Sequence, residues 1–211
     1  SLFSIIFSIT SAFSQAVSTG LGNFQVKSGS ALLVSPAGSN QVVVNLSSNK
    51  SILQWDRLNI PIGNSLQFNQ PGSQSVVLNR VVSVDSTRID GALTSNGQVW
   101  LLNGSGLLFG PGSQVNVQGL LASTKDITDL DFLTSNFKLN GAGIGKITNL
   151  GNIAASQGGY VLLLGPQVEN QGRIQAQLGQ AILASGKAYA LDLNGDKLLR
   201  FDVTEPLTSS D

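Results

Sequence analysis

Apolar and polar residues alternate along several short segments of the chain. In three of them apolar side chains occupy every second position: Val42, Val44 and Leu46; Leu66 and Phe68; Val115 and Val117. A period of two residues is typical of β-strands that bury one face. Turn signals separate these segments, at Pro36–Gly38, Pro61–Gly63, Pro71–Gly72, Asn96–Gly97, Gly110–Gly112, Asn140–Gly141 and Asn194–Gly195. The pattern predicts an all-β chain of short strands and tight turns.

The segments 149–169 and 170–190 repeat each other, and one constant interval separates every matched pair. The matched positions are Asn149 with Asn170, Gly151 with Gly172, Ile153 with Ile174, Ala155 with Ala176, Gly158 with Gly179, Leu162 with Leu183 and Gly165 with Gly186, while Val161 faces Ile182. A weaker echo relates NGQVWLL at 96–102 to GGYVLLL at 158–164, and the interval between them is close to three repeats. We infer a repetitive architecture.

A period of about 21 residues is too short for repeats of paired helices, and it fits one coil of a strand solenoid. Leucine-rich repeats have a similar period, but their L-x-x-L-x-L-x-x-N signature is absent. The repeat therefore favours a parallel β-helix, in which equivalent residues of successive coils stack about 4.8 Å apart. The predicted stack comprises Asn149, Gly151, Ile153, Asn170, Gly172 and Ile174.

Two residue pairs of this stack carry specific expectations. We expect Ile153 to lie on Ile174 inside the core, and Asn149 to donate a hydrogen bond to Asn170 as in an amide ladder. The alternative for the two asparagines is that both occupy exposed turns. We also expect Trp55 and Trp100, which lie in apolar strand-like runs, in or near the core.

The segment Lys125–Asn136 interrupts the strand pattern, because the spacing of its apolar residues is helical or irregular. We expect it to leave the helix as a short side excursion. Its three acids, Asp126, Asp129 and Asp131, raise the possibility of a metal site. Their neighbours supply no further ligands, so a solvated capping cluster is the better interpretation.

The first residues resemble the end of an export signal. Residues 1–16 combine an apolar stretch with small residues at Ser14 and Ala16, the spacing that a signal peptidase requires. We expect cleavage after Ala16; the alternative is a buried first strand. The domain then comprises residues 17–211, and no later apolar run is long enough to span a membrane. Residues 17–34 are the candidate cap, because an uncovered strand edge promotes aggregation.

Composition excludes several chemistries. The chain has 12 basic and 12 acidic residues, so no net charge attracts nucleic acid. It has no Cys and no His, which excludes disulfides, imidazole ligands and Ser-His-Asp or Cys-His catalysis. A pectin-lyase-like enzyme would need clustered carboxylates, whereas the acids of the repeat region, Glu169, Asp192 and Asp196, do not recur at the repeat offset. We expect no enzyme activity, metal or cofactor.

A series of motifs occurs in order along the chain: SNKSILQWDRLNI at Ser48–Ile60, FNQP at Phe68–Pro71, LNRV at Leu78–Val81, NGQVWLLNGSGLLFG at Asn96–Gly110 and VNVQGLLAST at Val115–Thr124. In order and wording these motifs resemble the N-terminal secretion domain of two-partner-secreted exoproteins, the filamentous haemagglutinins and high-molecular-weight adhesins. The later GGYVLLLGPQVENQGRIQA also resembles this family.

This resemblance implies a right-handed parallel β-helix with an N-terminal cap and side excursions. It also implies a secretion and folding-nucleation domain of a large adhesin or haemagglutinin. Such a protein uses the general secretory machinery, is recognised by periplasmic domains of a cognate outer-membrane β-barrel transporter, and reaches the surface of a Gram-negative-type bacterium. Its downstream part meets host or neighbouring cells. The implied recognition or secretion candidates are Asn69, Gln70, Pro71, Asn79, Arg80, Asn96, Gly97, Asn103, Gly104, Ser105 and Gly106.

One motif departs from the family pattern. The family commonly has Asn-Pro-Asn-Gly after the apolar strand, whereas this chain has Asn103-Gly104-Ser105-Gly106. Proline presets a turn and glycine does not, so we expect this turn to be looser in the unfolded chain.

The alternative function is a free-standing adhesive or carbohydrate-binding module, in which Arg57, Arg80 or Arg88 would contact a glycan or protein.

Overall fold

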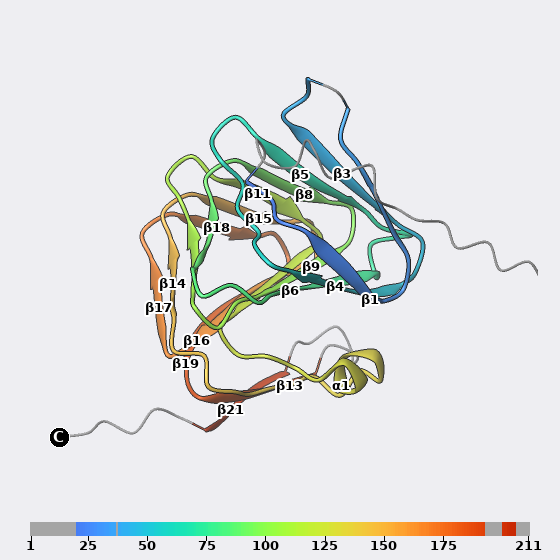
Figure 1. Cartoon of the computed structure of the whole chain (residues 1–211). Coiled ribbons are helices and arrows are strands. Elements are labelled where there is room, and N and C mark those ends of the chain that lie inside the picture. Colours follow the sequence, from blue (N-terminus) through green and yellow to red (C-terminus); the bar gives the residue numbers. More distant parts are fainter. Residues whose placement is uncertain (1–19, 37, 193–199, 206–211) are drawn as a thin grey trace, which may run out of the picture.

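The computed structural model describes residues 20–36, 38–192 and 200–205, and this part of the chain is almost entirely β-structure (Figure 1). Short strands wind into stacked coils, so that strands far apart in sequence lie side by side in three parallel sheets. The parallel β-helix predicted from the repeat is confirmed. The signal-like residues 1–16 lie outside the described residues.

Two seven-stranded sheets form the long sides of the helix. We call the first the covered sheet; in spatial order it contains β1 (Phe24–Ser28), β4 (Lys50–Trp55), β6 (Val76–Val81), β9 (Gln98–Leu102), β12 (Gly119–Ser123), β16 (Tyr160–Gly165) and β19 (Gln180–Ser185). We call the second the open sheet; it contains β18 (Arg173–Ala176), β15 (Asn152–Ala155), β11 (Gln114–Val117), β8 (Ala92–Ser95), β5 (Ser65–Asn69), β3 (Gln41–Leu46) and β2 (Ala31–Val34).

A four-stranded sheet closes the third side of the later coils. It contains β17 (Gln167–Asn170), β14 (Lys146–Asn149), β10 (Leu107–Phe109) and β7 (Thr87–Ile89). The pairs in these three sheets are parallel, except at the N-terminal edge of the two long sheets. There β1 runs antiparallel to β4, and β2 runs antiparallel to β3. The strands β1 and β2 thus cover the first coil; the domain boundary at residue 17 and the extent of a cap at 17–34 stay predictions.

Two hydrophobic cores lie on the two faces of the covered sheet. The first fills the interior of the helix and includes Trp55, Phe68, Phe109 and Ile153. The second lies on the outer face of the covered sheet, and Trp100 is buried in it. Both tryptophans are fully buried, as predicted.

The second core is closed by an outer layer beside the helix. This layer contains α1 (Asp129–Leu133), β13 (Lys138–Leu139), β20 (Ala188–Asp192) and β21 (Arg200–Glu205), whose strands form an antiparallel three-stranded sheet. In Figure 1 the layer lies below the covered sheet, with α1 near the end that carries β4. The predicted side excursion at Lys125–Asn136 is therefore confirmed, and it covers a sheet face that would otherwise be apolar and exposed.

The predicted stack is also present. Ile153 pairs with Ile174, and the Asn149 Nδ2 atom donates to the Asn170 Oδ1 atom at 2.7 Å. Asn149 is buried, so the alternative in which both asparagines occupy exposed turns is wrong. Ile174 differs from the expectation of a core position, because β18 is the last strand of its sheet and leaves this side chain half-buried.

The constant repeat interval does not hold through the covered sheet. Leu162 pairs with Ile182 rather than with Leu183, and Gly165 pairs with Ser185 rather than with Gly186. A Cβ atom at Gly179 would lie 1.9 Å from the Gly159 carbonyl oxygen, which places Gly179 on Gly159 and not on Gly158. The turn before β19 is thus one residue shorter than the turn before β16, and the register shifts by one.

The longer echo, between NGQVWLL and GGYVLLL, was also misinterpreted. Val99 pairs with Leu120, and Leu120 pairs with Val161, so the echo spans two coils and not three. The second of these coils is long because it contains the excursion with α1 and β13.

Candidate functional site

The motif residues Asn69 and Pro71 lie on the outside of the helix. Asn69 ends β5, donates to the Asn45 Oδ1 atom at 2.9 Å and accepts from the Gln67 Nε2 atom at 2.7 Å. It thus belongs to a ladder of amides on the outer face of the open sheet. Pro71 follows in an exposed turn.

Gln70 and Asn96 join the turns of two successive coils. The Gln70 backbone N–H donates to the Asn96 Oδ1 atom, and the Asn96 Nδ2 atom donates to the Gln70 carbonyl, each at 2.8 Å. The Gln70 side chain is buried and donates to the Gln98 carbonyl at 2.8 Å. A Cβ atom at Gly97 would lie 2.6 Å from the Gln70 side chain and 2.9 Å from the Ser75 carbonyl oxygen, so this close approach favours glycine.

The Asn103–Gly106 turn is held by the buried Asn103 side chain. The Nδ2 atom donates to the Asp85 carbonyl at 3.0 Å and to the Thr87 hydroxyl at 3.1 Å, and the Oδ1 atom accepts from the Ser105 N–H at 2.9 Å. Gly106 has a φ of +117°, and a Cβ atom there would lie 2.7 Å from the Lys146 carbonyl oxygen. The folded turn is thus well fixed; its looseness in the unfolded chain stays a prediction.

Neighbouring turns extend this corner of the helix. The Ser105 hydroxyl donates to the Ser83 carbonyl at 2.9 Å, and the Gly145 N–H donates to the Gly104 carbonyl at 3.0 Å. Two apolar side chains in these turns are left in solvent, since Val84 is 93% exposed and Ile144 is 85% exposed. Gly104 is also exposed.

Asn79 and Arg80 are adjacent in β6 and therefore point to opposite faces of the covered sheet. Asn79 lies inside the helix, where its Oδ1 atom accepts from the Trp55 Nε1 atom at 2.9 Å. Arg80 points outward to the excursion. Its guanidinium donates to Asp126 at 2.9 Å, to Asp129 at 2.7 Å and to the Ile127 carbonyl at 2.6 Å.

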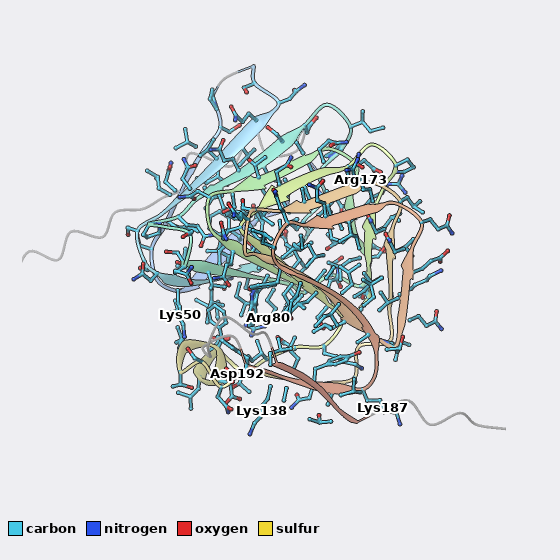
Figure 2. All side chains as sticks on the ribbon, turned by 180° about the vertical axis from the view of Figure 1, so that it is seen from behind. Lys50, Arg80, Lys138, Arg173, Lys187 and Asp192 are labelled. Atoms are coloured by element: carbon cyan, nitrogen blue, oxygen red, sulfur yellow. The ribbon has the colours of Figure 1, made fainter. Side chains whose placement is uncertain are left out.

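Lys50 makes a second set of contacts with the same excursion, and Figure 2 shows both cations beside the helix α1. Its Nζ atom donates to the carbonyls of Phe132 at 2.9 Å and Leu133 at 2.8 Å, and to the Ser135 hydroxyl at 2.7 Å. Partial burial lowers the pKa of Lys50. Burial also opposes the charge of Arg80, but the two aspartates outweigh it and raise the Arg80 pKa. Lys50 was not among the residues expected to act in recognition or secretion.

The three acids of the excursion have two different roles. Asp131 belongs to the cap of α1: its N–H donates to the Thr128 hydroxyl at 3.1 Å, and hydrogen bonds from Thr128 and Asn136 lower its pKa. Asp126 and Asp129 are solvated as expected, with side chains 56% and 43% exposed, but both pair with Arg80, which the expected capping cluster did not include. Within the described ranges, no group of three acidic, His or Cys side chains is arranged to hold a metal ion.

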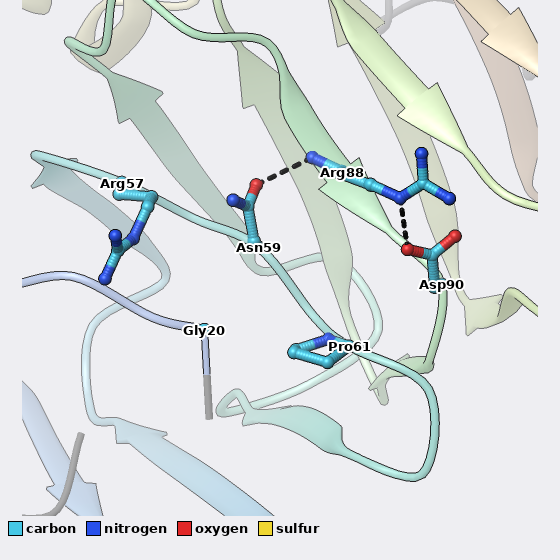
Figure 3. Close-up of a pocket in the computed structure, with 6 residues that line it drawn as sticks. All are labelled: Gly20, Arg57, Asn59, Pro61, Arg88 and Asp90. Atoms are coloured by element: carbon cyan, nitrogen blue, oxygen red, sulfur yellow. Dashed lines mark hydrogen bonds and ion pairs between the residues drawn. The ribbon is translucent and has the colours of Figure 1, made fainter. Parts of the chain in front are cut away.

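A pocket of about 300 Å³ lies near the first described residue (Figure 3). It is lined by Gly20, Arg57, Asn59, Pro61, Arg88 and Asp90. Arg88 forms an ion pair with Asp90, and the Asn59 Oδ1 atom accepts from the Arg88 backbone N–H at 2.8 Å. Arg57 and Arg88 thus line the same pocket, whereas Arg80 lies elsewhere, against the excursion.

Comparisons with known proteins agree with this architecture. The TPS secretion domain family matches residues 19–206. The secretion domain of HMW1 from Haemophilus influenzae superimposes with a TM-score of 0.81 at 29% identity, covering 90% of this chain and 50% of that chain. A heme/hemopexin-binding protein of Haemophilus influenzae is 30% identical over 187 residues, which is 81% of this chain. A second protein of that description and species is 35% identical over 89 residues, 42% of this chain.

The chain belongs to the family of TPS secretion domains, which are the secretion domains of two-partner secretion exoproteins. Domains of this family interact with a cognate outer-membrane transporter, and the proteins that carry them are exoproteins secreted by Gram-negative bacteria. The chain spans only 20% and 10% of the two heme/hemopexin-binding proteins. Among the described residues, no helix has the length and apolar character to cross a membrane.

Proposed function

We propose that this domain directs export of a large adhesin or haemagglutinin-type exoprotein and starts its folding outside the cell. Its partner is the cognate outer-membrane β-barrel transporter, whose periplasmic domains recognise this chain after the general secretory machinery has delivered it. The observation that carries the proposal is the family match over residues 19–206 on a helix of stacked coils.

The stacking suits folding in one direction. Each coil contacts mainly its neighbours, so the structure can grow from an existing coil without waiting for distant residues. Antiparallel strands occupy the N-terminal edge, whereas β17, β18 and β19 end their sheets with half-buried residues such as Ile174 and Ile182. Coils formed outside would therefore retain the emerging chain and favour its outward movement.

The burial of several motif residues supports recognition before folding. Gln70, Asn79, Gly97 and Asn103 are buried in the folded domain, and a partner could reach these residues only in an extended chain. Other candidates, such as Pro71, remain exposed after folding. We propose that the transporter binds the motif residues in the unfolded chain, and that the same residues then form the turns of the folded helix.

We place adhesive or ligand-binding activity in the part of the exoprotein downstream of this domain, facing host or neighbouring cells at the bacterial surface. Two relatives are described as heme/hemopexin-binding. This chain contains no His, Cys or Met, which are the usual iron ligands apart from tyrosine, so we assign no heme ligation to it. We also propose no catalytic role.

The test is secretion of the domain with and without its cognate transporter. Export to the medium should require the transporter, and Asn103→Ala should reduce it, because that amide lies in the motif turn and fixes it. Asn116→Ala, on the exposed outer face of the open sheet, is the control and should be secreted normally. Equal secretion without the transporter would disprove the proposal.

A further inference from the structure

The segment Asp126–Asn140 contacts parts of the helix that precede it by several coils. Arg80 pairs with acids 46 and 49 residues later, and Lys50 binds the Ser135 hydroxyl 85 residues later. Parallel neighbours in the first coils of the covered sheet are much closer in sequence, such as Val76 and Gln98. These contacts therefore connect the first coils to a segment that lies between β12 and β16.

We propose that Asp126–Asn140 is a latch that locks the first coils outside the cell once this segment has emerged. The locking step makes release of the early coils from the transporter irreversible, and it is the regulatory element of the export function proposed above, on which it rests. Until the latch arrives, the early coils are held only by their neighbours.

The latch is a self-closed unit. The Asp126 N–H donates to the Asn140 carbonyl at 2.7 Å, and the Asn140 N–H donates back to the Asp126 carbonyl at 2.9 Å. Below this bridge, the Lys125 Nζ atom donates to the carbonyls of Gly141 at 2.9 Å and Gly143 at 2.7 Å. Its ends are thus joined to each other, and the segment between them can dock without changing the stacking of the coils.

The surface on which the latch docks is the outer face of β4, β6 and β9. Ile52, Leu78 and Trp100 form its apolar centre, and all three are fully buried in the complete domain. The latch covers Trp100 with two aromatic rings, whose centroids lie 5.4 Å (Phe132) and 4.9 Å (Phe137) from the indole. Until the latch emerges this apolar centre would face water, because Tyr189 and Leu191, the outer-layer residues of β20 in the same core, come later in the chain.

The two cations of this surface receive their acceptors from the latch. In the described part of the chain, the guanidinium of Arg80 and the ammonium of Lys50 hydrogen-bond only to residues 126–135. Lys50 also lies 5.7 Å and 5.5 Å from the ring centroids of Phe132 and Phe137. Apolar contacts and charge complementarity thus identify the latch as the occupant of this face.

The variant Asp126→Asn/Asp129→Asn tests the latch, because both acids are partly exposed, at 56% and 43%, and their amide replacements keep the shape of the side chains. Hydrogen exchange on the purified domain should show protection of β4 and β6 falling about tenfold or more, with β15 and β18 unchanged. The matched control is Glu169→Gln, which removes the exposed ion pair with Lys146 outside the latch. Unchanged protection of β4 and β6 in the double variant would overturn the latch.

Secretion with the cognate transporter tests the export step. The double variant should be secreted several-fold less than the wild-type domain, whereas the control Glu169→Gln should be secreted normally. If exchange rises but secretion equals that of wild type, the locking role in export is wrong. If the wild-type domain itself is not secreted, the proposed function fails, while the exchange result still decides whether the latch holds the early coils.

Discussion

The covered sheet and the open sheet run through the same coils, but they differ in how many faces they bury. In the open sheet, β11 alternates exposed and buried positions, with Val115 and Val117 inside and Asn116 in solvent. In the covered sheet, β12 and β16 are buried at almost every position. Parallel strands buried on both faces form continuous apolar runs, as GLLAS and YVLLLG do here.

The difference shows where a β-helix carries an outer layer. One face of each sheet must line the interior, so alternation is the expected pattern for a side that meets water. Loss of alternation on one side therefore predicts that something covers that side. Strands that are apolar at nearly every position therefore indicate an outer layer, even though the segments that form the layer are distant in the chain.

The largest expected effect comes from placing a charge on the outer face of each sheet. Leu121→Asp would bury a carboxylate in the second core, between Trp100 and Leu162, and should lower the free energy of unfolding by about 4 kcal/mol or prevent folding. Asn116→Asp, in the same coil of the open sheet, should change it by less than about 0.5 kcal/mol. Equal costs in urea unfolding would show that the covered face is not buried.

Burial also decreases along the open sheet towards its last strand, β18. Ile153 is 1% exposed and has a strand on each side, whereas Ile174 is half-buried in the last strand. Ile153→Ala should cost about 3 kcal/mol and Ile174→Ala about 1 kcal/mol, because the cost of removing methyl groups grows with burial. Denaturant unfolding of both variants measures this gap, and Gln175→Ala is the exposed control. A larger cost at Ile174 would contradict the burial gradient.

The stability cost of replacing an amide side chain should also differ between the two sheets, but by a smaller margin. Asn79→Leu would leave the Trp55 Nε1 group inside the helix without its acceptor, at a cost of about 2 kcal/mol. Asn69→Leu removes an outer-ladder hydrogen bond where water can replace it, and should cost less than about 1 kcal/mol. Thermal melting of both variants provides the measurement, and the interpretation of Asn79 is wrong if the two melt alike.

The last difference between the two sheets is an alkaline pH dependence that arises on the covered side. The chain has two tyrosines, Tyr160 and Tyr189, and both pack in the second core. Burial raises the pKa of Tyr189 to about 12 and raises that of Tyr160 as well, whereas an unfolded tyrosine titrates near 10. The folded state therefore keeps the tyrosine protons longer, so the contribution of the two tyrosines to stability should be constant below about pH 10 and be lost as the pH rises towards 12.

Urea unfolding at pH 8 and pH 11 measures this loss. Tyr189→Phe should make the difference between the two pH values smaller, because the removed hydroxyl no longer titrates in the unfolded chain. If the free energy of unfolding differs between pH 8 and pH 11 by the same amount in that variant as in the wild type, groups other than Tyr189 cause the loss of stability at alkaline pH.

The sequence was sufficient to predict the β-helix and part of the stacking between its coils. Alternation at Val115 and Val117 and the repeat of Asn149 at Asn170 are local or one coil apart, and both patterns survive in the structure. The one-residue shift of β19 was not predictable, because a shortened turn leaves the strand composition unchanged.

The outer layer was recognised only as an excursion, and its contacts were missed. No period relates Arg80 to Asp126 or Lys50 to Ser135, so stacking arguments cannot bring them together. The candidate motif residues were found through resemblance, and the structure separates them into turn residues, interior residues, the outer-ladder residue Asn69 and the latch contact at Arg80. The continuous apolar run Val99–Leu102 was the signal that could have indicated the second core.

The closed base of the latch has a consequence for comparing related sequences. Because Asp126 and Asn140 are bridged, Leu120 stacks on Val161 although the intervening coil is about twice as long as the one before it. Coil length can therefore change during evolution at such a loop while every strand keeps its partner. Alignments of these domains should allow gaps at loops with joined ends and none within strands, and foreign peptides for display should be inserted at similarly closed loops.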